Sequence, residues 1–298
     1  MNRSFATFSL AWAIFCLINS SDAGRAFEQL RQQDCGVLPN TTITQRLHSR
    51  IYGGKPSFLM TQPWMAFIYI PNNLETCRCG GSLISQRFVL TAAHCYEMCP
   101  KPSELRVRLG EFDLNSSTDC ITFGYKRICA PPVEEFAIER WIIHEGFNVF
   151  TPGYDIALVR LDQIVVFKDH IRPICLPLTE DLQAYTSVIG NPYKAVGWGL
   201  TENGISSIIL MEVEIDTDRC PNGEDSSFLC ANGNDVDTCR GDSGGPLVMS
   251  RNYFGTSGNV QYGVTSSGHT ECGAGRGASY MNVSSFMPWI IAKLEAFP

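Results

Sequence analysis

The chain has 298 residues, of which 44% are hydrophobic and 18% are charged, and 23 Lys and Arg against 30 Asp and Glu give a net charge of −7. These ordinary globular values exclude a disordered, collagenous or coiled-coil chain. The negative charge, without any Lys/Arg-rich run, argues against binding to nucleic acid through phosphate contacts. After the presumed leader no apolar stretch reaches the roughly 18 to 20 residues that cross a bilayer, so we expect neither nucleic-acid nor membrane partners.

The amino terminus has the order of a secretory signal peptide. Arg3 precedes a mostly apolar run at residues 5–18, and small residues lead to a cleavage position after Ala23. A buried core helix is the alternative for this stretch. Of the 13 cysteines, Cys16 lies in this leader, and the even number that remains suits disulfides, which persist outside the cytosol. We therefore expect residues 1–23 to be removed and the chain to be secreted.

Residues 24–50 are polar, and the character of the chain changes after Arg50. From there on, β-branched and aromatic segments recur between Gly, Pro and Asn, and residues 105–109 alternate strictly between apolar and polar side chains, as a half-buried strand does. The predicted strands are 64–70, 88–91, 105–109, 138–143, 156–161, 194–196, 211–215 and 262–265. We expect an all-β region that forms one large domain or two packed barrels.

Only the tail has helical spacing. Apolar residues recur between Phe286 and Phe297, Ser284 and Ser285 offer capping oxygens, and Pro288 can occupy a first turn. We therefore predict one helix at the end of the chain.

Three segments carry the residue types that nucleophilic catalysis needs. His94 ends an apolar strand and adjoins Cys95, Asp155 stands at the mouth of a strand, and Ser243 lies in the glycine-rich turn 241–246. A serine hydroxyl is a weak nucleophile until a base takes its proton, and the base needs a third group that fixes its tautomer. Singly, each segment is more often a packed histidine, a turn former or an ordinary turn. Together they follow the order His, Asp, Ser of the chymotrypsin class.

Residues 51–298 resemble the trypsin/chymotrypsin family of secreted serine endopeptidases. The resemblance implies two six-stranded antiparallel β-barrels with the active site between them, a C-terminal helix, and no required cofactor. It implies that Ser243 is the nucleophile, His94 the general base and then acid, and Asp155 the orienting carboxylate. The backbone N–H groups of Gly241 and Ser243 correspond to the oxyanion hole.

The resemblance also implies synthesis as a zymogen. The Arg50–Ile51 bond matches the activation site of the family, and the amine that cleavage frees on Ile51 would pair with Asp242, the residue before the nucleophile. An ordinary exposed Arg–Ile bond is the alternative. Because Arg50 is basic, the activator should itself have trypsin-like specificity. The expected domains are therefore a signal peptide at 1–23, a pro-segment at 24–50 and a protease domain at 51–298.

Substrate preference is expected to depend on Asp237. It precedes the nucleophile by six residues, at the position that carries an acid in trypsin-like members, whereas a surface acid is the alternative. Ser266 and Gly268 resemble the wall and entrance of the pocket, so cleavage after Arg or Lys follows. Ser267 stands where the family usually has an aromatic residue, and Ala278 where it usually has glycine, which leaves the choice between Arg and Lys open.

The resemblance extends to the cysteines. It implies the pairs Cys79–Cys95, Cys220–Cys230, Cys239–Cys272, Cys35–Cys175, Cys120–Cys129 and Cys77–Cys99. Zinc ligation is the alternative, but the cysteines have no matching histidine pair. This pattern, with an insertion between Glu111 and Pro132, is most like the protease domains of arthropod clip-domain cascade enzymes. The pro-segment has only Cys35, whereas a clip module needs six cysteines of its own.

The inserted loop also suggests calcium. Glu111, Asp113, Asn115 and Asp119 provide the hard oxygens that calcium prefers, and related proteases often bind it here. A solvated acidic loop is an equal alternative, and a glycan would compete with coordination. The glycosylation sequons begin at Asn40, Asn115 and Asn282.

The sequence thus predicts a secreted trypsin-like zymogen of a limited-proteolysis cascade. Its expected partners are a protein substrate, which could be another zymogen, an upstream trypsin-like activator and a serpin-type inhibitor. The tethering Cys35 argues against a digestive trypsin. A catalytically silent homologue that acts as a secreted binding protein is the alternative from another class, and the presence of His94, Asp155 and Ser243 argues against it.

Overall fold

A computed structural model gives the structure of the chain, and it describes residues 24–39, 54–71, 73–151, 153–201, 204–220, 225–232, 241–268 and 278–298. Among the described residues, no helix is long and apolar enough to span a membrane. Several predictions fall outside these ranges and concern the signal peptide 1–23, Asn40, Arg50, Ile51, Asp237, Cys239 and Cys272.

Six antiparallel strands close the first barrel in the order β2-β3-β4-β9-β8-β5. Their bounds are β2 (Met65–Ile70), β3 (Asn73–Leu83), β4 (Phe88–Thr91), β5 (Arg106–Leu109), β8 (Glu134–Ile143) and β9 (Ala157–Leu161). Every residue of β2 is buried. One cause is the second barrel, because Phe67 of β2 packs edge-on against Trp198 of that barrel.

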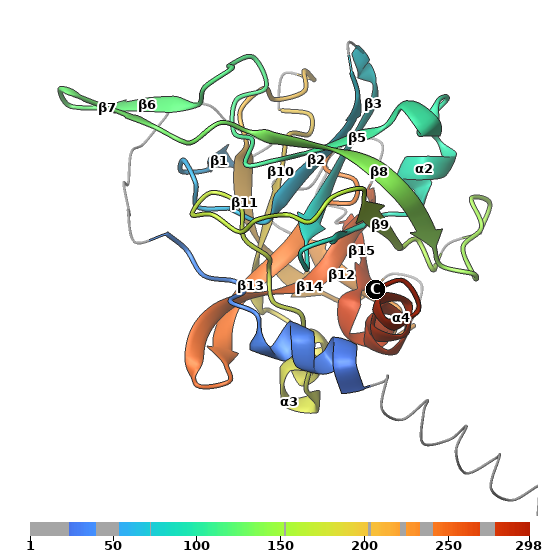
Figure 1. Ribbon diagram of the computed structural model, residues 1–298. Helices are drawn as coiled ribbons and strands as arrows, with labels where there is room; N and C mark the ends of the chain where they lie inside the picture. Colours follow the sequence, from blue (N-terminus) through green and yellow to red (C-terminus); the bar gives the residue numbers. More distant parts are fainter. Residues whose placement is uncertain are drawn as a thin grey trace, which may run out of the picture.

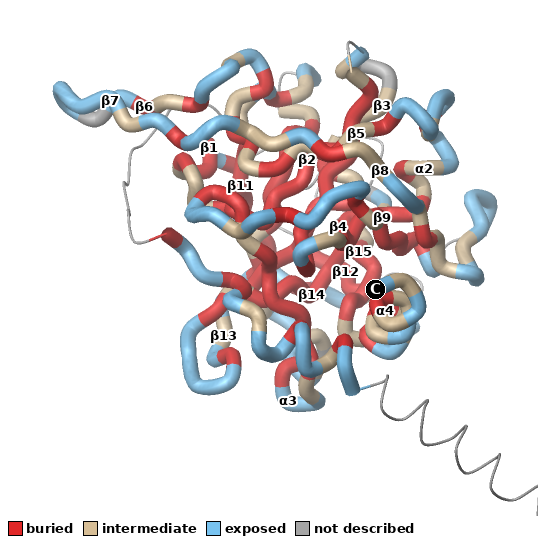
Figure 2. Tube along the Cα trace, in the orientation of Figure 1, coloured by how far each residue is buried: buried red, intermediate tan, exposed pale blue. Residues whose placement is uncertain are grey.

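The second barrel is built from a sheet in the order β1-β11-β10-β13-β14-β15-β12, in which the additional pairing of β11 with β12 closes a ring of six strands and leaves β1 at its edge. Its strands are β1 (Lys55–Pro56), β10 (Pro192–Gly197), β11 (Met211–Asp218), β12 (Phe228–Asn232), β13 (Pro246–Tyr253), β14 (Thr256–Gly268) and β15 (Ala278–Asn282). Buried residues fill both barrels and the region where they meet (Figure 2). The predicted architecture of two six-stranded antiparallel barrels is therefore confirmed.

Several helices lie outside the two barrels (Figure 1). They are α2 (His94–Glu97), η1 (Pro102–Glu104), α3 (Glu180–Gln183), η2 (Ala184–Ser187) and α4 (Val283–Ala296). The insertion forms a separate hairpin of β6 (Cys120–Phe123) and β7 (Lys126–Cys129), which projects away from both barrels in Figure 1.

Residues 24–32 form a helix that the sequence analysis did not predict, because it treated the pro-segment as merely polar. Ala26 and Leu30, four residues apart, lie on its inner face and join the hydrophobic core. Gly36 then donates its N–H to the Pro173 carbonyl at 2.8 Å, and Asn259 N donates to the Gly36 carbonyl at 3.0 Å. The described part of the pro-segment is thus docked on the folded body.

The predicted C-terminal helix is present as α4, but its start differs from the prediction. Asn282 is the cap, since its Oδ1 accepts a hydrogen bond from Ser284 N at 3.1 Å. The predicted capping by Ser284 and Ser285 is therefore wrong, and Pro288 lies inside the helix rather than in its first turn. An Asx side chain accepts from the N–H two residues on more readily than a serine within the helix can.

The same contacts contradict the predicted glycosylation at Asn282. Its side chain is 7% exposed, and Nδ2, the atom that would carry a glycan, donates to the Ser226 carbonyl at 2.9 Å. A glycan on this nitrogen would displace that hydrogen bond and the neighbouring chain. Asn115 is exposed instead.

Five disulfides lie within the described residues. They are Cys35–Cys175, Cys77–Cys99, Cys79–Cys95, Cys120–Cys129 and Cys220–Cys230. These are the pairs that the family resemblance implies for those ten cysteines. The first one ties the pro-segment to the body across 140 residues.

Candidate active site

Strand β3 fixes the histidine turn. His94 begins α2 directly after β4, and the adjoining Cys95 is bonded to Cys79 of β3. Cys77 of the same strand is bonded to Cys99 just beyond α2. Among the described residues, Cys79, His94 and Cys95 are the one group of metal-ligand types whose ligand atoms converge. Both sulfur atoms are in a disulfide and cannot act as thiolate ligands, so this cluster is not a zinc site.

His94 and Asp155 form a tight pair. The imidazole Nδ1 lies 2.7 Å from Asp155 Oδ2, and the His94 backbone N–H donates to Oδ1 at 2.8 Å. The carboxylate can only accept, so Nδ1 carries the proton and Nε2 is left with its lone pair. This tautomer is the one that a general base needs.

Ser266 supplies a further contact that sequence reasoning missed. It was assigned to the wall of the pocket, but its hydroxyl donates to Asp155 Oδ2 at 2.6 Å. Burial raises the pKa of Asp155, but the hydrogen bonds from His94 and Ser266 and the nearby imidazole outweigh it, so this pKa lies below its usual value. Asp155 is only 6% exposed and is held as a carboxylate.

The Ser243 turn is held by backbone groups. Gly245 N donates to the Asp242 carbonyl at 2.8 Å, which closes a four-residue turn, and Gly80 N of β3 donates to the Ser243 carbonyl at 2.7 Å. Gly244 has φ +79°, a conformation that favours glycine, and a Cβ there would collide with Thr91 Oγ1. The turn therefore packs against β3 and β4, the two strands that precede His94 in the chain.

Ser243 lies beside the histidine turn, since its carbonyl oxygen is 3.8 Å from Cys95 Sγ. Within the described residues, no hydrogen bond joins Ser243 Oγ to His94. Such catalytic hydrogen bonds are commonly loose without substrate and tighten in the complex. Gly241, the other predicted oxyanion residue, has φ +97° and packs against Gly199.

Asp242 points away from Ser243 into the second barrel. It is 2% exposed, and its Oδ1 accepts a hydrogen bond from Gly199 N at 2.8 Å. A Cβ at Gly197 or Gly199 would overlap the Asp242 carboxylate, so both positions need glycine. The Gly-Trp-Gly pattern at 197–199 was the sequence signal for this cradle, and the sequence analysis did not use it.

The specificity residues are only partly described. Ser267 is exposed near the end of β14. Gly268 is the last residue of that strand and pairs in register with Ala278 of β15. Ala278 itself is 3% exposed. Asp237 lies outside the described residues, so the floor of the pocket stays a prediction.

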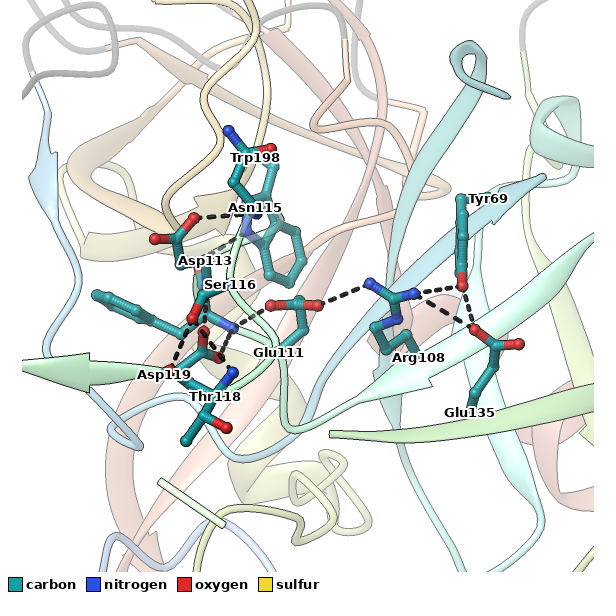
Figure 3. A network of polar contacts seen from close by, with 11 residues as sticks. Tyr69, Arg108, Glu111, Asp113, Asn115, Ser116, Thr118, Asp119, Glu135 and Trp198 are labelled. Carbon is teal, nitrogen blue, oxygen red and sulfur yellow. Dashed lines mark hydrogen bonds and ion pairs between the residues drawn. The ribbon is translucent and has the colours of Figure 1, made fainter. Parts of the chain in front are cut away.

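The predicted calcium residues belong to a buried polar network (Figure 3). Glu111 Oε1 and Asp119 Oδ2 both accept from Phe112 N at 2.9 Å, and Arg108 donates to Glu111 Oε2 at 3.0 Å. Glu111 is 4% exposed and Asp119 is 2% exposed, so the alternative of a solvated acidic loop is wrong for both side chains. Burial and the neighbouring Glu111 carboxylate raise the pKa of Asp119 to about 6.

Asp113 does not join these two carboxylates. Its Oδ1 accepts from Asn115 N at 3.1 Å. The described residues contain no set of three acidic ligand atoms that converge here. The side chains alone therefore fit a calcium ion only in part.

Comparison with known proteins agrees with this geometry. The family model described as Trypsin matches residues 51–290. The chain is 37% identical over 269 residues to Serine protease grass of Drosophila melanogaster, covering 86% of this chain and 69% of that protein. It is 36% identical to Spaetzle-processing enzyme of the same organism, covering 94% and 74%. It is also 37% identical to CLIP domain-containing serine protease B4 of Anopheles gambiae, covering 86% and 71%.

A solved structure gives the same result. The crystal structure of the Drosophila Grass clip serine protease of the Toll pathway superimposes with a TM-score of 0.79 at 34% identity, and the match covers 93% of this chain and 79% of that one. The barrels, the His94–Asp155 pair and the Ser243 turn therefore occur in a chain that belongs to the trypsin family of serine endopeptidases and resembles its clip-domain members.

Proposed function

We propose that this chain is a secreted zymogen whose cleaved form hydrolyses peptide bonds after Arg or Lys through an acyl-enzyme. Ser243 is the nucleophile, His94 the base and acid, and Asp155 the orienting carboxylate. The observation that carries this proposal is the His94–Asp155 hydrogen bond of 2.7 Å beside the Ser243 turn. A buried His–Asp pair is not needed for stability, because hydrophobic residues of similar volume often stabilise a fold equally well. Its position beside a serine turn therefore favours a catalytic role.

The reaction follows from the protons that these groups hold. Ser243 Oγ attacks the carbonyl carbon of the scissile bond while its proton passes to His94 Nε2, and the imidazolium is stabilised by Asp155. The carbonyl oxygen becomes an oxyanion that the N–H groups of Gly241 and Ser243 bind. His94 then gives the proton to the leaving amine, and the acyl group stays on Ser243. Water repeats the sequence, releases the acid and restores the serine.

Activation is proposed to begin with cleavage between Arg50 and Ile51. Strand β1, which starts at Lys55, four residues after Ile51 in sequence, pairs with β11 of the second barrel, the barrel against which Asp242 is buried. The Asp242 carboxylate is buried beside Gly199, and a buried carboxylate is a suitable partner for a protonated amine. Pairing of the two would fix the turn that carries Ser243.

Specificity for Arg or Lys is proposed to come from Asp237 at the pocket floor, with Gly268 at its entrance. Ser266 has a second role in this proposal, because its side chain is committed to Asp155 and only its backbone is free to contact substrate. An acid at the pocket floor would pair with a basic side chain in a desolvated site, where such a pair discriminates strongly.

A cascade role is supported by the attachment of the pro-segment. The Cys35–Cys175 disulfide and the docked helix at residues 24–32 would keep this segment on the enzyme after cleavage. The similar proteins include a Spaetzle-processing enzyme and a protease of the Toll pathway. We accordingly propose a protein substrate that includes other zymogens, an upstream trypsin-like activator, a serpin-type inhibitor and an extracellular location.

We further propose that calcium is a structural ligand of the loop at residues 111–119 and takes no part in the reaction. The support is the burial of two repelling carboxylates, Glu111 and Asp119, which a cation would relieve. Millimolar calcium should then raise the melting temperature of the wild type and not of Asp119→Asn. Equal melting temperatures with calcium and with a chelator would contradict this. Exposed Asn115 is the proposed glycan site in the same loop, and Asn40 is a second.

The test uses three forms of the full chain: wild type, Arg50→Gln and Ser243→Ala. Each is treated with a trypsin-like protease that is then removed, and peptide amides ending in Arg, Lys or a large apolar residue are assayed. We expect wild type alone to release the amine, and only from the basic peptides. Turnover of apolar peptides alone would overturn the role of Asp237. Correctly cleaved wild type without any turnover would instead support a catalytically silent homologue.

A further inference from the structure

We propose that Arg78 is a positioning residue for the oxyanion turn, an assignment that rests on the proposed function of Ser243. Arg78 lies in β3, between the two cysteines that fix the histidine turn. Its side chain crosses to the second barrel, which carries Ser243. It thereby connects the two halves of the active site.

The guanidinium holds two separate points of the second barrel. Arg78 Nη2 donates to the Trp198 carbonyl at 3.2 Å and to the Ser207 carbonyl at 3.0 Å. Ser207 N in turn donates to the Gly199 carbonyl at 2.9 Å. The peptide units on both sides of Gly199 are therefore fixed, one by the Arg78 cation and the other by a backbone hydrogen bond.

Two aromatic rings restrict the position of the guanidinium. Its carbon lies 5.6 Å from the centroid of the Phe67 ring, and Phe67 packs edge-on against the Trp198 ring at 5.3 Å. Phe67 and Trp198 are each 1% exposed, so the stack is buried between the barrels. A guanidinium that lies over an aromatic ring and donates hydrogen bonds from its edge has little freedom to move.

The held segment is the one that orients Asp242. Gly199 N, which directly follows the carbonyl that Arg78 binds, donates to Asp242 Oδ1 at 2.8 Å. Asp242 in turn lies between Gly241 and Ser243, whose N–H groups form the proposed oxyanion hole. Gly80, two residues after Arg78 on β3, also holds this turn through its hydrogen bond to the Ser243 carbonyl at 2.7 Å. Strand β3 therefore binds the turn directly through Gly80 and supports it indirectly through Arg78.

This arrangement predicts a particular kinetic signature. The two hydrogen bonds from Arg78 act on the Trp198 and Ser207 carbonyls, and neither residue is among those that we assign to substrate binding. The oxyanion forms only in the transition state, so loosening of the turn should lower kcat and leave KM nearly unchanged. A ligand that makes a tetrahedral adduct on Ser243 should weaken in parallel with kcat.

The experiment compares Arg78→Met, Arg78→Lys and the control Arg140→Met in the full chain after cleavage at Arg50. Arg140 also stacks on a ring, that of Phe297 at 5.0 Å, but its partner is at the end of the chain. For each protein kcat and KM are measured on an Arg peptide amide, with inhibition constants for a peptide boronic acid and for benzamidine. The boronic acid probes the tetrahedral state, and benzamidine probes the pocket alone.

We expect Arg78→Met to lower kcat about tenfold and to weaken the boronic acid by the same factor, because it removes a charged hydrogen-bond donor. KM and the benzamidine constant should stay within about twofold of wild type. Arg78→Lys should recover part of the loss, since an ammonium can reach one carbonyl but lacks the planar fork. If Arg78→Met does not fold, Arg78→Lys is tested instead. The change in kcat is then compared with the change in KM, and the change in boronic acid affinity with the change in benzamidine affinity.

Three results would overturn the assignment. The first is that Arg78→Met has the same kcat and inhibition constants as Arg140→Met. The second is that kcat and benzamidine affinity fall together. The third is that Arg78→Lys recovers none of the lost kcat. If wild type itself forms no boronic acid adduct after cleavage, the proposed function fails first, and this outcome is distinguishable from a failure of Arg78.

Discussion

The two halves of the candidate active site are held by different kinds of contact. His94 and Asp155 are joined through side chains, with Ser266 as a third member and a disulfide behind them. The Ser243 turn is held through backbone N–H and carbonyl groups and through glycines that admit no Cβ. The first half can therefore lose one contact at a time, whereas the second half should fail as a unit when any one glycine is replaced.

The largest expected effect concerns the side-chain half. Asp155→Asn should lower kcat by roughly four orders of magnitude, because an amide can donate to Nδ1 and so favours the wrong tautomer of His94. KM should change little. The check is steady-state kinetics of the cleaved protein on an Arg peptide amide. A loss smaller than tenfold would mean that His94 does not depend on Asp155.

The backbone half should respond to one methyl group. In Gly199→Ala the new Cβ would overlap the Asp242 carboxylate and push it from its place. We expect kcat to fall by roughly 100- to 1,000-fold, the range for loss of oxyanion stabilisation. The downfield proton resonance of the His94 Nδ1–H should persist, since neither of the two Asp155 hydrogen bonds to His94 involves Asp242. Loss of this resonance together with kcat would show that the halves are coupled.

A smaller effect is expected for Ser266→Ala. It removes one hydrogen bond from Asp155, so kcat should fall by roughly tenfold or less. The depressed pKa of Asp155 stabilises the fold above the unfolded value of about 3.9, and this stabilisation is lost as the pH falls through the folded pKa. The variant has a less depressed pKa, so its acid unfolding midpoint, measured by circular dichroism, should move to higher pH than that of the wild type. An unchanged midpoint would contradict the role of Ser266.

The smallest catalytic effect is expected at Asn282, whose side chain contacts Ser226 and Ser284. Asn282→Ala should cost about 1 kcal/mol of unfolding free energy through loss of the helix cap and leave kcat unchanged. The mass of the secreted protein should not fall beyond the residue difference, whereas Asn115→Gln should remove a glycan. A glycan lost with Asn282→Ala would show that this asparagine is exposed during folding.

The same contrast explains what the sequence could predict. The segments around His94, Asp155 and Ser243 have distinctive residue types and a distinctive order, and the family resemblance that they carry implies both barrels. Strand alternation at residues 105–109 also corresponds to β5 (Arg106–Leu109) almost exactly as expected. These are local signals that need no knowledge of distant contacts.

Long-range contacts were not predictable in this way. Nothing in a lone serine shows that Ser266 donates to a carboxylate 111 residues earlier in the chain. The helix at residues 24–32 depends on two inward apolar residues in a polar segment, and its stability comes from the body on which it packs. The cap at Asn282 was hidden because its sequon suggested a surface position.

The most direct test of the account is to map a covalent label on the protein cleaved at Arg50. After reaction with diisopropyl fluorophosphate, peptide mass mapping should place a single adduct on Ser243, and His94→Ala should abolish it. Correctly cleaved protein that forms no adduct, or an adduct on another residue, would contradict the claim that His94, Asp155 and Ser243 act together.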